Sequence, residues 1–248
     1  MTKAEALESI RTNIVSHGQH VYLVLGGPNP RYAYTIGLSE AVGAELILAG
    51  AAFYSAKEVF EVINRLTSIL RATRDLSQTD HSMEELGRFS LRKVHQTWSS
   101  KLILGATDYY KNPAVPALQA VPDDEHRTID VPDLSQPFSA TEEPIWQWLE
   151  KSWDYSLPKN TMVITDLDAL RGETITEAAR WEETDWEIFA ESVYELDKKN
   201  CRAVPFGTLL AADPSLKEVV DWKVGKARWR EPSDLGWRKW RSSESDDD

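Results

Sequence analysis

Residues 20–38 read HVYLVLGGPNPRYAYTIGL. Both ends of this stretch are short runs of β-branched and aromatic residues, which favour strands. Between them, residues 26–30 read GGPNP, and this density of glycine and proline indicates a turn. The sequence therefore predicts a hairpin whose two strands span residues 20–25 and 31–38.

The segments around the hairpin predict a mixed domain. Residues 2–16 have an amphipathic helical pattern, and Thr2 and Glu5 have the spacing of a capping box. Residues 45–49 predict a strand, and Ser55 caps a helix predicted over residues 55–73. The polar residues 75–85 predict a loop. Strands are predicted over residues 89–94 and 117–121, and a helix over residues 99–111.

The second half predicts another mixed domain after a connection. Residues 127–145 contain prolines and little periodicity, and residues 146–153 predict a short bridging helix. Residues 161–165 begin a second apolar unit, strands are predicted over residues 186–189, 203–210 and 226–230, and a helix is predicted over residues 213–222. We therefore expect an α+β fold of two mixed α/β domains built on mainly antiparallel sheets. The expected divisions are residues 1–140, a linker at 141–157, a Trp-rich domain at 158–241 and a disordered acidic tail at 242–248.

The chain is acidic, with 28 Lys and Arg against 40 Asp and Glu and a formal net charge of −12. This balance argues against general nucleic-acid binding, which needs a basic field. Acids gather between residues 166 and 197, whereas residues 198–241 are rich in Lys and Arg. An acidic stretch of this kind attracts a basic protein partner. The candidate partner-binding residues are Asp166, Asp168, Glu182, Glu183, Asp185 and Glu187.

Neither a membrane span nor a leader is predicted. No run approaches the roughly 18 uncharged apolar residues of a membrane helix, and residues 1–10 have no apolar signal core. We expect a cytoplasmic protein with no membrane partner. Cys201 is the single cysteine, so no internal disulfide can form, and it is expected to be a small buried residue rather than a nucleophile.

No catalytic or metal-binding motif is recognisable. The chain has five histidines, and the spacing of His17 and His20 would place them on opposite faces of a strand. Asp166 and Asp168 would share one side of a strand and could act as paired carboxylates, although solvation explains them more simply. We therefore expect no catalytic residues, no metal and no cofactor.

Residues 34–38, YTIGL, support an alternative. This alternating strand ends on Gly37, and a glycine allows close approach of a backbone or a ligand. A similar run lies near the flavin phosphate in flavin reductase-type split barrels. That resemblance implies a flavin or nucleotide site at Tyr34, Thr35 and Gly37, with Asp123 as a further candidate. Packing within the fold explains the same residues.

Four tryptophans near the C-terminus, at positions 222, 229, 237 and 240, are interleaved with Lys and Arg. Aromatic residues among bases can stack on nucleic-acid bases. They can equally form a small core with solvated Lys and Arg neighbours, or place these Lys and Arg side chains against the acidic stretch at 166–197. The net charge of the chain favours the last two interpretations.

Three pieces of the first half together resemble the DUF4262 family over about residues 8–140. They are GQHV at 18–21 leading into YAYTIGL at 32–38, AELIL at 44–48, and VPALQAVPD at 115–123 followed by Gln136 and Pro137. Val121 stands where the family is associated with a tryptophan, and residues 128–130 replace a usual Pro-Trp. If those positions line a site, the site is altered here. The family has no established activity to transfer.

The second half resembles DUF2185-like domains, which are associated with immunity proteins of bacterial toxin systems. The matching stretches are DWEIF at 185–189, DPSL at 213–216 and GKAR at 225–228, with Trp237. The leading hypothesis is therefore an immunity protein that binds and neutralises a basic toxin domain without chemistry of its own. The alternative is a flavin- or nucleotide-binding enzyme built on the first domain. A regulatory scaffold that uses both domains is a third possibility.

Overall fold

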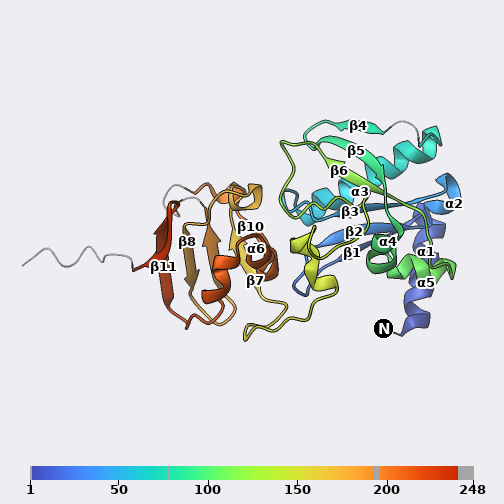
Figure 1. Cartoon of the computed structure of the whole chain (residues 1–248). Coiled ribbons are helices and arrows are strands. Elements are labelled where there is room, and N and C mark those ends of the chain that lie inside the picture. Colours follow the sequence, from blue (N-terminus) through green and yellow to red (C-terminus); the bar gives the residue numbers. More distant parts are fainter. Residues whose placement is uncertain (1, 77–78, 191, 193–195, 240–248) are drawn as a thin grey trace, which may run out of the picture.

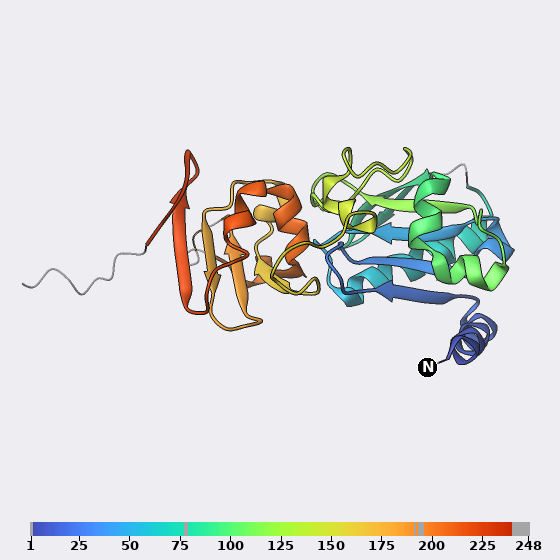
Figure 2. The same cartoon turned by 60° about the horizontal axis from the view of Figure 1, so that its bottom comes forward.

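The protein is described from a computed structural model, in which residues 2–76, 79–190, 192 and 196–239 are placed. It contains two six-stranded sheets, each with its own helices (Figure 1). Antiparallel pairs dominate both sheets, so the expected α+β class is confirmed. The two sheet-based units, called here the N-terminal and C-terminal units, lie side by side in both views (Figures 1 and 2).

The N-terminal sheet has the strand order β1-β2-β3-β6-β5-β4. The predicted hairpin is confirmed, because β1 and β2 pair antiparallel with Tyr22 opposite Tyr34. One pair, β3 with β6, is parallel. The strands are β1 (His20–Val24), β2 (Tyr32–Ile36), β3 (Glu45–Ala49), β4 (Asp80–Met83), β5 (Gly87–Lys93) and β6 (Ala117–Pro122).

Helices cover both faces of this sheet. Successive side chains of a strand point to opposite faces, and on β3 Leu46 and Leu48 pack in the same core as α3, whereas Ile47 and Ala49 pack in the same core as α4 and α5. A sheet buried on both faces explains why β3 is apolar without alternation. The helices are α1 (Lys3–His17), α2 (Ser39–Val42), α3 (Ala56–Thr73), α4 (Gln96–Leu102) and α5 (Leu104–Tyr110).

The connection between the units packs against both of them. Its 3₁₀ helix, η1 (Pro144–Leu149), buries Trp146, whose Nε1 donates to the carbonyl oxygen of Asp130 at 3.0 Å. Two residues later, Trp148 donates to the carbonyl oxygen of Gly207 in the C-terminal unit at 3.2 Å. The expected linker with a bridging helix is therefore a shorter 3₁₀ segment, held from both sides.

The C-terminal sheet has the order β10-β7-β9-β8-β11-β12. Its strands are β7 (Met162–Thr165), β8 (Glu177–Arg180), β9 (Trp186–Phe189), β10 (Arg202–Pro205), β11 (Lys226–Glu231) and β12 (Asp234–Arg238). The helical segments are η2 (Ala169–Arg171), η3 (Lys198–Asn200), α6 (Phe206–Ala212) and η4 (Pro214–Glu218). Helix α6 contacts η1 and lies between this sheet and the N-terminal unit (Figure 1).

Several predicted elements differ from the structure. The predicted loop at 75–85 contains β4, and the predicted helix at 99–111 is two helices that meet at Ile103. The predicted strand at 203–210 ends at Pro205, where α6 begins, and the predicted helix at 213–222 is reduced to η4. Strand β8 was not predicted. The tail at 242–248 lies outside the described residues, and none of the helices placed in the structure is long and apolar enough to cross a membrane.

Candidate binding surface on the C-terminal sheet

One face of the C-terminal sheet carries its core. Trp186 and Ile188 of β9, Val163 of β7 and Ala178 of β8 pack there against residues of α6 and η4. The strand registers place a different row on the opposite face, since side chains that pair across strands point the same way. Crossing the sheet from β10 to β11, that row is Ala203, Ile164, Glu187, Ala179 and Ala227.

This opposite face, called here the open face, is exposed over β7 and the end of β8. Met162 and Ile164 of β7 are 41% and 37% exposed, and Trp181 is 47% exposed. Phe189, at the far end of β9, is buried. The open face therefore presents large apolar side chains to solvent on both sides of the start of β9.

The β8–β9 hairpin, whose turn spans residues 181–185, carries the predicted acids Glu182, Glu183 and Asp185. All three are exposed, and Glu187 is half-buried on β9. Trp181 donates its indole Nε1–H to Oε2 of Glu187 at 2.7 Å, and its backbone amide bonds to the carbonyl oxygen of Asp185. Glu187 of β9 therefore lies between the indole of Trp181, which directly follows β8, and the aliphatic side chain of Ile164 on β7.

Arg180 anchors this hairpin to the rest of the unit. Its guanidinium donates to the carbonyl oxygen of Trp222 at 2.6 Å and to that of Glu183 at 3.4 Å. The same group lies over the ring of Trp186, 4.9 Å from the ring centroid. These contacts attach the turn, and with it the three acids, to the core of the C-terminal unit.

The two remaining predicted acids do not join this surface. Asp166 is fully buried just after β7, and its carboxylate accepts hydrogen bonds from the amides of Ala169 and Ala190. The prediction that it binds a partner is therefore wrong, because the carboxylate orders two backbone segments inside the unit. Asp168 is about half exposed and lies 3.7 Å from Arg171. Because both follow the end of β7, they do not form paired carboxylates on one strand.

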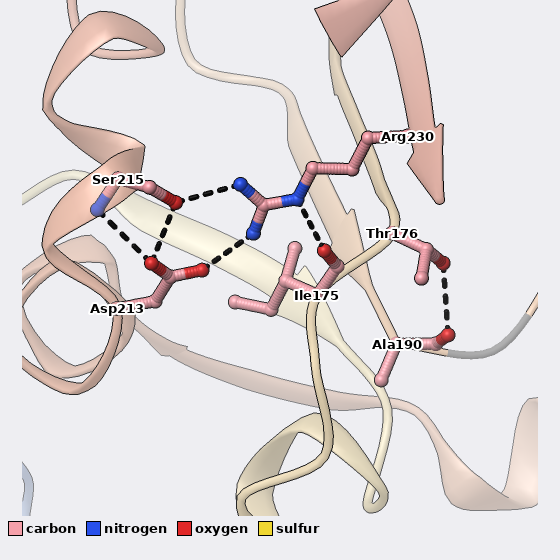
Figure 3. Close-up of polar contacts among 6 residues, drawn as sticks. All are labelled: Ile175, Thr176, Ala190, Asp213, Ser215 and Arg230. Atoms are coloured by element: carbon pink, nitrogen blue, oxygen red, sulfur yellow. Dashed lines mark hydrogen bonds and ion pairs between the residues drawn. The ribbon is translucent and has the colours of Figure 1, made fainter. Parts of the chain in front are cut away.

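A buried arginine holds the β11 side of the sheet together. Figure 3 shows Arg230 donating to Ser215, to Asp213 and to the carbonyl oxygen of Ile175, each at 2.6 Å. Its side chain is fully buried, and its guanidinium lies 4.4 Å from the ring centroid of Trp237. Close charge-assisted bonds of this kind are among the stronger hydrogen bonds in proteins. Arg230 thus ties β11 to η4 and to the segment before β8.

Two of the interleaved tryptophans, Trp222 and Trp237, belong to or border the core, and Trp229 is half-buried outside it. Trp222 packs in the core of the C-terminal unit with Trp237 at its margin, and their rings meet edge to face at 5.3 Å. Lys226 lies over Trp222 at 4.2 Å. This arrangement supports the interpretation as a small core with basic neighbours. Trp240 lies outside the described residues.

The residues of the alternative flavin or nucleotide site lie in the N-terminal unit, where they make contacts with other residues of the fold. Thr35 and Tyr34 are buried, and the Thr35 hydroxyl donates to Glu45 at 2.5 Å. The Gly37 amide donates to Glu45 and to the Tyr110 hydroxyl. With φ at +102°, Gly37 approaches Ile14 so closely that a Cβ atom would lie 2.8 Å from Ile14 Cγ1. A flavin phosphate would have to replace a carboxylate here.

Glu45, which the sequence reasoning did not single out, organises this region. Its carboxylate is buried and also accepts from the Ser39 amide and the Tyr110 hydroxyl. Burial raises the pKa of Glu45, although its hydrogen bonds oppose that shift. The available signal was an acid at the start of an otherwise apolar strand.

Asp123 does not meet Tyr34, Thr35 or Gly37, because it follows β6, two strands away from β2. Its carboxylate contacts Nδ1 of His126 at 2.6 Å and accepts from the Arg88 amide at 2.7 Å. Burial alone would raise the pKa of Asp123, but these hydrogen bonds lower it overall. The four alternative residues therefore do not form one site. Among the described residues, no group of three His, Cys, Asp or Glu side chains could hold a metal ion.

Fold and surface together define a two-unit α+β protein with a fixed acidic hairpin beside exposed apolar residues. Residues 13–128 match the family model described as "Domain of unknown function (DUF4262)", which confirms the DUF4262 resemblance within those bounds. The match stops before the C-terminal unit, for which a DUF2185-like relationship is not shown. No curated protein and no solved structure matches the chain.

Proposed function

We propose that this chain is a non-catalytic binding protein whose C-terminal unit docks a basic protein domain. The observation that carries the proposal is the anchored β8–β9 hairpin, on which Glu182, Glu183 and Asp185 are exposed beside Trp181. Exposed acids alone are usually a solvated surface. Here they share a short turn with a large aromatic ring, and Trp is one of the residue types enriched among interface hot spots.

Electrostatics supports a basic partner. The turn adds three carboxylates within four positions to a chain of net charge −12. A local field of this sign steers a positively charged protein during its diffusional approach and speeds association, with a strong dependence on salt. A partner of the same sign would be repelled.

The finer proposal is an immunity protein that occludes a bacterial toxin domain. The sequence resemblance of the C-terminal unit to DUF2185-like domains motivates it. A toxin that cleaves nucleic acid carries a basic phosphate-binding surface, and a row of carboxylates can occupy such a surface in place of phosphates. The cytoplasmic location expected from the sequence fits this role.

The test starts with the full-length tagged chain purified from its native cell. A stoichiometric basic protein should be captured and identified by mass spectrometry, and its association rate should be measured at several salt concentrations. Reversing the hairpin charges with E182K, E183K and D185K should slow association by about 10-fold or more at low salt. The immunity role is tested by whether expression of the captured protein alone stops growth and co-expression of this chain restores it.

The matched control reverses three exposed acids elsewhere, with E40K, E84K and E142K. This variant has the same net charge as the hairpin variant but an intact turn. Equal slowing by both variants would show that only overall charge matters, and would contradict the assignment to the hairpin. If no basic protein is captured at stoichiometric level, the proposal is wrong.

A further inference from the structure

We infer that the partner docks across the open face as well as on the hairpin turn, with a surface on which Lys or Arg side chains are flanked by apolar ones. This inference rests on the proposed function and adds the chemistry of the contact. The candidate surface consists of Met162 and Ile164 on β7, Glu187 on β9, and Trp181 and Asp185 at the two ends of the turn that joins β8 to β9.

The strand registers set out three parallel lines of different chemistry. Glu187 pairs with Ile164 on one side and with Ala179 on the other. Two residues before Glu187, Asp185 ends the hairpin turn, and its carbonyl oxygen accepts a hydrogen bond from the Trp181 amide. Because neighbouring strands lie about 4.8 Å apart, a central line of carboxylates runs between an aliphatic line and a line containing an indole.

This pattern selects the partner. A purely basic surface would leave Met162, Ile164 and Trp181 in water. A purely apolar surface would bury the charges of Glu187 and Asp185 without a cation, which is costly, since the Trp181 indole alone does not neutralise Glu187. A Lys or Arg can reach the carboxylates while its aliphatic stem covers the apolar side chains. The exposed Trp181 ring also offers a face to a cation. The small, exposed Ala203 leaves room above the sheet for the side chains of a partner.

Charge also argues against two other occupants. A second copy of the chain that docked through this same face would bring the same carboxylates to it, and like charges across an interface are unfavourable. The C-terminal residues 242–248 read SSESDDD and carry no basic side chain, so the central line of carboxylates would repel them.

Two helical probe peptides test the inference on the full chain. In the first, leucine and lysine share one face; in the second, glutamine replaces every leucine, so that charge is unchanged. We expect the leucine peptide to bind at least about 10-fold more tightly than the glutamine peptide. Exchange of backbone amide hydrogens should slow in β7 and in the β8–β9 hairpin when the leucine peptide is bound.

Substitutions locate the contact. The double variant M162T/I164T should remove the preference for leucine over glutamine, because it deletes the aliphatic line from an exposed strand where threonine is well tolerated. W181A should weaken leucine-peptide binding by about 10-fold. The control L25T/L104T removes two exposed leucines of the N-terminal unit, 64% and 58% exposed, and should leave both affinities unchanged. Melting temperatures and circular dichroism verify that each variant is folded.

Cys201 provides a second readout, which reports where on the sheet the peptide lies. The thiol is half-buried and directly precedes β10, and its pKa is raised by burial first, and then by the charges of Asp166 and Glu187. Maleimide labelling of this single thiol should slow when the leucine peptide is bound, and the glutamine peptide at the same concentration should have a smaller effect.

The outcomes separate the two proposals. If both peptides bind equally, or if M162T/I164T leaves the preference for leucine intact, the inference about the open face is wrong although the acidic hairpin still binds a basic partner. If reversing Glu182, Glu183 and Asp185 leaves peptide binding and partner binding unchanged, the proposed function is wrong. If sedimentation shows a dimer of the chain that M162T/I164T dissociates, the occupant is a second copy and the inference is overturned.

Discussion

Replacing Arg230 with methionine should destabilise the C-terminal unit strongly. Methionine fills much of the volume of the arginine stem but removes three hydrogen bonds of 2.6 Å and leaves the carboxylate of Asp213 without its cation. Removing one partner of a buried ion pair costs about 3–5 kcal/mol. Because the Asp213 side chain is 24% exposed, solvent recovers part of this energy, and we expect a loss of about 3 kcal/mol.

The assay must follow the C-terminal unit by itself. Pulses of hydrogen–deuterium exchange are applied during a urea titration, and mass spectrometry measures the uptake in peptides that cover residues 175–231. A loss of about 3 kcal/mol should lower the urea midpoint by about 1 M or more. Adding D213N to R230M should restore part of the stability, because no charge is then left without a partner.

Arg238 is the matched control for this prediction. It also lies over a tryptophan ring, that of Trp229, and contacts Asp234 at 2.6 Å, but its side chain is 47% exposed. Exposed pairs contribute little to stability, so R238M should leave the urea midpoint unchanged. If R230M lowers the midpoint no more than R238M does, the argument that burial makes the Arg230 contacts important is refuted.

Three further predictions concern the N-terminal unit and its contact with the C-terminal unit. Burial raises the pKa of Glu45 above the ordinary value of about 4.3, so the folded protein holds this proton more tightly than the unfolded chain does. Stability should therefore fall as pH rises from that value through the raised pKa. The E45Q variant should show a smaller fall in urea midpoint over this pH window, and an equal fall in both proteins would contradict the assignment to Glu45. Gly207→Ala should lower the free energy of unfolding by about 1–3 kcal/mol, because the added Cβ would lie 2.4 Å from the Pro28 carbonyl oxygen and 2.9 Å from Trp148 Nε1. The loosened contact should appear as faster proteolysis of the connection at residues 150–160. An unchanged rate of proteolysis would show that the contact tolerates the methyl group. Flavin mononucleotide should leave the melting temperature unchanged, because the Gly37 amide already donates its hydrogen bonds to Glu45 and Tyr110. A clear rise in melting temperature would support the cofactor hypothesis.

Elements with strong local signals could be predicted from the sequence. The hairpin at 20–38 combines strand-forming runs with a Gly/Pro turn, and α3 combines an N-cap at Ser55 with a regular apolar face. The capping boxes predicted at Thr2 and seen again at Ser55 are both formed. In these cases the local preference and the tertiary environment agree.

Elements whose environment overrides local preference could not be predicted. Strand β8 reads EAAR, which favours a helix, but it lies between β9 and β11 and gains hydrogen bonds on both edges. Strand β4 reads DHSM, and only its alternate residues His81 and Met83 are buried. After β10, the run Phe206 to Ala212 is apolar enough for either structure, and only its packing against η1 and η4 selects the helix.

The candidate surface was predictable where it depends on composition and turn position, and unpredictable where it depends on the fold. Composition identified the acidic stretch, and exposure of Glu182, Glu183 and Asp185 follows from their place in a turn. The burial of Asp166 could not be read from composition, because it depends on amides of Ala169 and Ala190 that the fold brings to it. The apolar part of the open face depends on strand register, which no local pattern specifies.

The position of Trp146 decides where this protein could be divided. The family match ends at residue 128, yet Trp146 fills the same core as Trp98, with ring centroids 5.9 Å apart, and Leu134 and Ile145 close that core from the same segment. A gene shortened to the matched residues would encode an N-terminal unit with one wall of its interior missing and Trp98 facing water. The smallest piece that retains its own interior therefore extends through η1, about twenty residues beyond the limit that family similarity suggests.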